Sequence, residues 1–134
     1  MVAKPLPVID DDSRPYWDGA REHRLLIQRC GDCARAVFYP RSVCPHCGSL
    51  RLEWFEAAGT GTVHSFTVAR RPAGPAFVGD VPLVVALVEL DEGVRLLSNV
   101  RARPEEMAIG ARVRVWFDDV TPDLTLPKFD LLPG

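Results

Sequence analysis

The apolar residues of this chain fall into short runs that proline, glycine and charged residues separate. Runs of four to eight apolar or alternating residues that end at turn residues are typical of β-strands. Gly93 closes one tight connection between two such runs, where a positive φ is needed. The pattern therefore predicts a mostly β protein. The expected strands cover residues 25–29, 36–39, 50–55, 62–70, 83–90, 94–100, 113–117 and 126–132.

One segment near the N-terminus has the periodicity of a helix. Ser13 is a suitable cap, and Tyr16 and Trp17 begin an apolar face. We expect a short helix over residues 15–24. Such a helix is marginal in isolation, so its aromatic face must pack against something. Two interpretations stay open: the face covers its own chain, or Tyr16 and Trp17 contact a partner protein.

Four cysteines form two close pairs with the spacing C-x2-C-x10-C-x2-C: Cys30, Cys33, Cys44 and Cys47. Two turns that each present two thiolates make a closed tetrahedral metal site, so we predict one structural Zn²⁺ ion. Iron in a rubredoxin-like site shares this geometry. The cysteines could also form two disulfides, which a reducing compartment disfavours, or remain four inert thiols. His46 lies inside the second pair and is expected to be an exposed turn residue.

The order of these motifs predicts the architecture. Strands alternate with the two cysteine turns over residues 25–57, which is the order of a zinc ribbon. Five further strands follow in residues 58–134, with a short helical turn near residues 104–107 between the third and the fourth. This is the arrangement of a five-stranded OB-fold barrel. Residues 1–24 then form an N-terminal arm and the short helix.

Charge and hydropathy exclude some classes of protein. The net charge is −2, and neither half of the chain has the strong basic excess of a protein that follows a phosphate backbone. Nucleic acid is therefore a disfavoured partner. No apolar run approaches the roughly 18 residues of a membrane-spanning helix, and the N-terminus lacks the apolar core of a secretory signal. We expect a cytoplasmic protein that does not enter the membrane.

The sequence contains no defensible catalytic constellation. It has neither a nucleophile elbow nor a glycine-rich phosphate loop. His64 and Ser65 are neighbours on a strand and are expected to point to opposite faces. Arg70 and Arg71 end the same strand before a proline- and glycine-rich loop with Phe77. These three residues are the candidate site for an anionic ligand, and solvated charge at a strand end is the competing interpretation.

The full set of motifs resembles a family of acyl-CoA-associated proteins, a domain of unknown function with a rubredoxin-like zinc ribbon followed by an OB fold. The matching features are the Tyr16-Trp17 pair, both cysteine turns, Pro40-Arg41, the segment 59–63, Pro82 with the strand 84–90, and the segments 91–94 and 109–113. The resemblance extends over about residues 14–130. It implies an accessory protein rather than a stand-alone enzyme.

Members of this family partner thiolase-like enzymes, aldolases and hydratases that act on CoA thioesters, including those of steroid side-chain degradation. The resemblance thus implies a non-catalytic scaffold in a hetero-oligomer, with structural zinc and contact with acyl-CoA. It carries over no catalytic residue. A single-stranded nucleic-acid-binding module and a hydrolase or thioesterase are the alternative interpretations.

Overall fold

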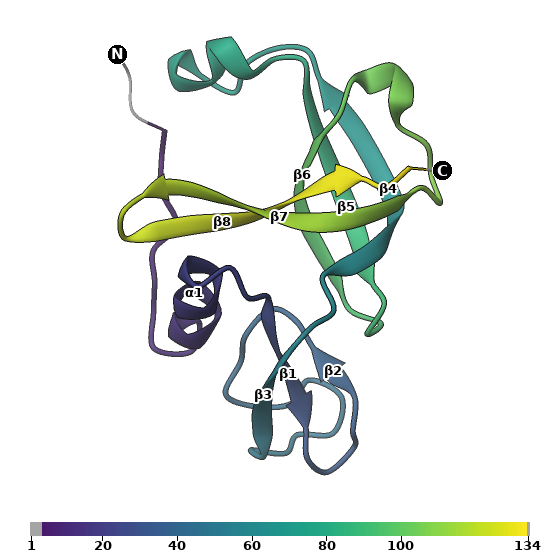
Figure 1. Cartoon of the computed structure of the whole chain (residues 1–134). Coiled ribbons are helices and arrows are strands. Elements are labelled where there is room, and N and C mark those ends of the chain that lie inside the picture. Colours follow the sequence, from purple (N-terminus) through teal and green to yellow (C-terminus); the bar gives the residue numbers. More distant parts are fainter. Residues whose placement is uncertain (1–3, 134) are drawn as a thin grey trace.

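The computed structural model describes residues 4–133, which form one short helix, two 3-10 turns and eight strands in two sheets (Figure 1). The expected mostly β fold, with a helix, a ribbon and a five-stranded OB barrel, is confirmed. The elements are α1 (Arg14–Arg21), β1 (Leu26–Cys30), β2 (Ala36–Val37), β3 (Leu52–Glu56), β4 (Thr60–Ala69), η1 (Pro75–Asp80), β5 (Leu83–Leu90), β6 (Arg95–Arg101), η2 (Pro104–Glu106), β7 (Arg112–Thr121) and β8 (Leu124–Leu131).

Helix α1 is shorter than the sequence predicts. It ends at Arg21 rather than at residue 24, because the amides of Glu22 and Arg24 both donate to the carbonyl of Gly19 at 2.9 Å. Ser13 precedes the helix, as expected, but its hydroxyl donates to Asp10 Oδ1 at 2.7 Å instead of capping a helical amide. The side chain of Ser13 therefore fixes the chain that leads into the helix.

The ribbon sheet is antiparallel and has the order β2-β1-β3. Strand β1 is its central strand, and both Ile27 and Gln28 in it are buried. The run expected at residues 36–39 contributes only the two-residue edge strand β2. The side-chain amide of Gln28 accepts from the Arg41 amide at 2.8 Å and donates to the Arg41 carbonyl at 2.9 Å. This pair ties the loop after β2 to the centre of the sheet.

The barrel closes in the order β4-β5-β6-β8-β7, with β7 returning to β4. Strand β5 alternates strictly between buried and half-buried residues, which fits its position in the wall of a small barrel. Phe129 of β8 is fully buried in the interior. The short helical turn expected near residues 104–107 is η2, which lies between β6 and β7. None of the helices within residues 4–133 has the length and apolar character to cross a membrane.

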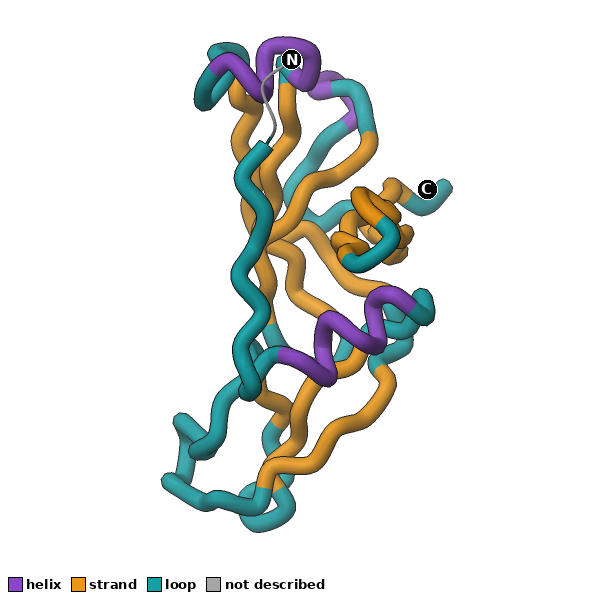
Figure 2. Tube along the Cα trace, turned by 90° about the vertical axis from the view of Figure 1, so that its left-hand side faces the viewer, coloured by secondary structure: helices purple, strands orange, loops and turns teal. Residues whose placement is uncertain are grey.

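Helix, ribbon and barrel share one hydrophobic core. Tyr16 and Trp17 of α1 pack in the same cluster as Ile27 of β1 and Phe129 of β8. In Figure 1, α1 lies between the β7–β8 hairpin and the ribbon, and Figure 2 shows the extended N-terminal arm following the side of the barrel. Lys4 of this arm forms an ion pair with Asp80 at 2.6 Å. The parts therefore support one another through the surfaces that they bury together.

Close packing of β4 against β5 leads to a test of the barrel. A Cβ on Gly61 would lie 2.5 Å from the carbonyl oxygen of Glu89, which is backbone and cannot rotate away. We expect Gly61→Ala to lower the free energy of unfolding by about 2 to 3 kcal/mol. A Cβ on Gly79 meets nothing within 4 Å, so Gly79→Ala should stay within about 0.5 kcal/mol of the wild type. Urea unfolding of both variants measures the difference, and equal stabilities would contradict the packing.

Candidate functional site

The four cysteines lie together at the end of the ribbon. Their sulfur atoms are all within 4.8 Å of one another. The Sγ atoms of Cys30 and Cys47 are 3.6 Å apart, and those of Cys33 and Cys44 are 3.7 Å apart. A tetrahedral ion with metal–sulfur bonds of about 2.3 Å has sulfur–sulfur edges of about 3.8 Å. The thiols are free, and these separations far exceed a disulfide bond of about 2.05 Å, so the disulfide interpretation is wrong for this structure.

The two cysteine turns have the same backbone design. The amide of Ala34 donates to the carbonyl of Cys30 at 2.9 Å, and the amide of Gly48 donates to the carbonyl of Cys44 at 2.9 Å. Both donor residues are left-handed, with φ of 64° for Ala34 and 80° for Gly48. Glycine adopts this conformation without steric cost, whereas alanine does not. The first turn therefore places a strained residue where the second has a relaxed one.

Backbone amides donate hydrogen bonds to the sulfur of Cys30 and thereby favour its thiolate form. The amides of Asp32 and Cys33 each lie 3.4 Å from the Cys30 sulfur. The hydrogen bond from Cys33, with that from Asp32, lowers the pKa of the Cys30 thiol to about 6. The hydrogen bond from the Ser49 amide likewise lowers the pKa of the Cys47 thiol. The neighbouring Cys30 sulfur, burial and the other two thiols outweigh it and raise the pKa of Cys47 to about 12. Four thiolates can therefore coexist here only around a cation, which makes the cluster a site for one metal ion.

A polar network around Asp32 links the two turns. Its carboxylate accepts from the Ser49 hydroxyl and, at 2.5 Å, from Arg51 Nη1. The amide of Gly31 also donates to the Arg51 carbonyl at 2.7 Å. These bonds fix the first turn against the chain that follows the second turn. His46 is exposed, as expected, and its Nδ1 lies 3.4 Å from Arg35 Nη1 rather than in the sulfur cluster.

The aromatic residues of α1 are buried in this chain. Tyr16 is 5% exposed and Trp17 is 8% exposed, and their rings meet edge to face with centroids 4.9 Å apart. Tyr16 also packs against Phe38 of the ribbon, with centroids 5.6 Å apart. This is the arrangement expected if the helix covers its own chain. Direct contact of these two residues with a partner protein stays a prediction.

The residues proposed for an anionic ligand do not form one pocket. Arg70 and Arg71 are exposed after β4, whereas Phe77 is half-buried in η1. The cavity that Phe77 lines contains neither arginine, but it contains the carboxylates of Asp80 and Asp118. An anion at Arg70 and Arg71 therefore stays a prediction, without support from the environment of Phe77.

The structure corrects the expectation for His64 and Ser65. A β-bulge shifts the register of β4 between Val63 and Ser65, and both His64 and Ser65 are exposed. The bulge places both residues on the outside of the barrel instead of on opposite faces. This pair offers solvent-facing polar groups and no shielded site for catalysis.

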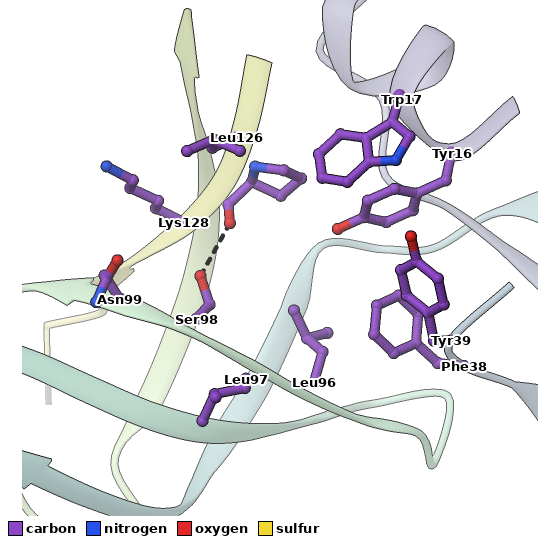
Figure 3. Close-up of a pocket in the computed structure, with 11 residues that line it drawn as sticks. Tyr16, Trp17, Phe38, Tyr39, Leu96, Leu97, Ser98, Asn99, Leu126 and Lys128 are labelled. Carbon is purple, nitrogen blue, oxygen red and sulfur yellow. Dashed lines mark hydrogen bonds between the residues drawn. The ribbon is translucent and has the colours of Figure 1, made fainter. Parts of the chain in front are cut away.

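A cavity that the sequence did not reveal lies beneath α1 (Figure 3). Helix α1 and the loop after β2 form one side of it, and strands β6 and β8 form the other. No run of residue types could have identified it, because it depends on how these four segments meet. Its lining residues are Tyr16, Trp17, Phe38, Tyr39, Leu96, Leu97, Ser98, Asn99, Leu126, Pro127 and Lys128.

Comparison with protein families gives two adjoining matches. Residues 17–53 match the model described as the rubredoxin-like zinc ribbon domain of ChsH2, and residues 54–118 match that of the C-terminal OB-fold domain of ChsH2. Among solved structures, the chain resembles a chain of the Ltp2-ChsH2(DUF35) aldolase with 43% identity and a TM-score of 0.84. That match covers 94% of this chain and 98% of the other.

Curated relatives include both long and short proteins. The chain is 45% identical to a probable enoyl-CoA hydratase alpha subunit of Thermomonospora curvata and 39% identical to the 3-oxo-4,17-pregnadiene-20-carboxyl-CoA hydratase alpha subunit of Mycobacterium tuberculosis. These matches cover 94% and 90% of this chain but only 39% and 38% of those proteins. It is also 34% identical to a DUF35 domain-containing scaffold protein of Methanothermobacter thermautotrophicus, with 75% of this chain and 76% of that protein covered.

Removing one sulfur ligand tests the metal centre. We expect Cys44→Ser to lose the single bound metal ion and to unfold at a clearly lower temperature, because a serine hydroxyl is a poor substitute for a thiolate. His46→Ala is the matched control in the same turn, and it should keep one equivalent of metal. Elemental analysis and thermal unfolding provide the two readouts. Full metal content in the Cys44→Ser protein would refute the assignment.

The two cysteine turns differ in the residue at the left-handed position, alanine in the first and glycine in the second, and this difference gives a second test. Ala34→Gly removes the steric cost of the left-handed backbone, so we expect a gain of about 0.5 to 1 kcal/mol. Gly48→Ala introduces that cost into the other turn and should lose roughly 1 kcal/mol. Thermal unfolding of the metal-loaded proteins measures both effects. A loss of stability in Ala34→Gly would show that the backbone of the first turn is not strained.

Proposed function

This chain belongs to the DUF35 family, in which a rubredoxin-like zinc ribbon precedes an OB fold, and on that premise we propose that it is a non-catalytic scaffold subunit of an enzyme acting on CoA thioesters. The observation that carries the proposal is the likeness, at 43% identity, to nearly the whole ChsH2(DUF35) chain of an aldolase complex. The partner we propose is a thiolase-like aldolase or a hydratase, in a hetero-oligomer. Four free thiols in a metal cluster suit the reducing cytoplasm, where we place the complex.

We assign the metal as zinc with a structural role. Four sulfur ligands complete a tetrahedral shell, so no coordination position is left for a substrate or an activated water. When bound, the ion holds the two cysteine turns together and supplies no chemistry to a substrate. A rubredoxin-like iron centre would colour the protein, so a colourless preparation with one equivalent of zinc supports this assignment.

The lengths of the relatives support a non-catalytic role. The two hydratase alpha subunits are matched over less than two-fifths of their length, so their names describe proteins with much additional chain. Relatives of comparable length are named scaffold proteins. Within this chain, the metal centre is closed and the His64-Ser65 pair is exposed. We therefore propose that the catalytic residues lie in the partner.

Reconstitution with an aldolase tests this function. We expect the chain to co-elute with the Ltp2 aldolase subunit in size-exclusion chromatography with light scattering, and to increase the soluble yield of Ltp2 on co-expression. The ChsH2(DUF35) chain of the solved complex serves as the positive control. The isolated chain should not turn over an acyl-CoA. Separate elution of the two proteins, or turnover by the chain alone, would overturn the proposal.

A further inference from the structure

The four cysteines differ in how far solvent reaches them. Cys47 is exposed, and Cys33 is half-buried. Cys30 is 1% exposed and Cys44 is 2% exposed. The residue after Cys47 is also open to solvent, because a Cβ on Gly48 would meet no atom within 4 Å among residues 4–133. One sulfur ligand therefore faces solvent while its neighbours are shielded.

The exposed sulfur has a shielded sulfur beside it. The Sγ atoms of Cys30 and Cys47 are 3.6 Å apart, and a disulfide bond brings two sulfur atoms to about 2.05 Å. A solvent-accessible thiolate with a second thiol next to it is the arrangement that redox-sensing cysteines have. Cys33 and Cys44 are about as close, at 3.7 Å, but neither of them is exposed. Exposure therefore selects Cys47 as the first sulfur to react and Cys30 as its partner.

We propose that the cysteine cluster is a redox switch, in which a peroxide oxidises Cys47, a disulfide forms with Cys30, and the bound metal ion leaves. Hydrogen peroxide transfers one oxygen atom to the Cys47 thiolate, which gives a sulfenic acid and hydroxide. The Cys30 thiolate then attacks the Cys47 sulfur, so that the S–S bond forms, the S–O bond breaks and a second hydroxide leaves. The two thiolates thus lose two electrons to the peroxide. A thiol reductant reverses the disulfide by exchange.

Loss of the ion acts on the loop between the two cysteine turns. Cys33 and Cys44 lie at the ends of this loop, and two remaining thiolates are too few for a tetrahedral shell. The loop carries Phe38 and Tyr39, whose ring centroids lie 5.6 and 6.3 Å from that of Tyr16 in α1 (Figure 3). Oxidation therefore loosens the packing between the ribbon and the helix. That it also weakens binding of the partner enzyme rests on the proposed function, whereas the chemistry of the switch does not.

Treatment of the zinc-loaded chain with hydrogen peroxide tests the switch. We expect one equivalent of zinc to be released, as measured with a colorimetric chelator, together with the loss of two thiols. Peptide mass spectrometry after alkylation should find a disulfide between Cys30 and Cys47, with Cys33 and Cys44 alkylated. The oxidised chain should unfold at a clearly lower temperature. Dithiothreitol with added zinc should restore the metal content and the unfolding temperature.

Two histidine substitutions form a matched pair, because three cysteines and one histidine also hold structural zinc. Cys47→His removes the exposed thiol, whereas Cys33→His keeps both members of the proposed pair. Since the sulfur atoms left in Cys47→His are shielded, we expect peroxide to release its zinc at least roughly 5-fold more slowly than that of Cys33→His. Both proteins are compared at equal zinc content.

Three outcomes would each defeat the inference: zinc that stays bound in peroxide, a disulfide between another pair of cysteines, or equal rates of zinc release from the two variants. If the variants do not hold zinc, the disulfide map of the wild type decides. Co-elution with Ltp2 is measured separately, before and after oxidation. A chain that forms the disulfide but never co-elutes keeps the switch and loses the proposed function. A chain that co-elutes but resists peroxide keeps its scaffold role and loses only the switch.

Discussion

The fold depends on the electrostatic requirement of four sulfur atoms held within 4.8 Å of one another. Without a cation the thiols compete for ionisation, because the pKa of Cys30 falls to about 6 while that of Cys47 rises to about 12. A divalent ion removes this competition by balancing the charge. The apolar cluster around the cysteines is small, with Val37 as its only fully buried aliphatic side chain among the residues described. Ion coordination therefore replaces hydrophobic burial in this half of the ribbon.

The other half of the ribbon depends on the barrel. Ile27 of β1 belongs to the main core, together with the aromatic residues of α1 and the interior of the barrel. Ribbon and barrel are thus joined by packing as well as by the link between β3 and β4. The ribbon and the barrel therefore keep a fixed relation to each other, because close-packed side chains join them.

The sequence predicts the features that arise from local patterns. Cysteine spacing predicted which four side chains come together in one sulfur cluster, and alternation located most strands to within two or three residues. It did not predict where α1 ends, because the Gly19 carbonyl and the left-handed His23 decide that locally. It also missed the bulge in β4, which exposes both His64 and Ser65. Local patterns could not reveal the cavity, because its walls come from segments up to 112 residues apart, Tyr16 to Lys128, that only the tertiary fold brings together.

The metal centre and the cavity are connected through one loop. Phe38 and Tyr39 line the cavity, and they lie on the chain between the two cysteine turns. This chain is held at both ends by the sulfur cluster, through Cys33 and Cys44, and close to its second end by the Gln28 side-chain amide, which pairs with both backbone groups of Arg41. An ion bound by the four cysteines would therefore fix the loop that forms one wall of this cavity, so the metal centre acts on the shape of the cavity through the backbone between the cysteine turns.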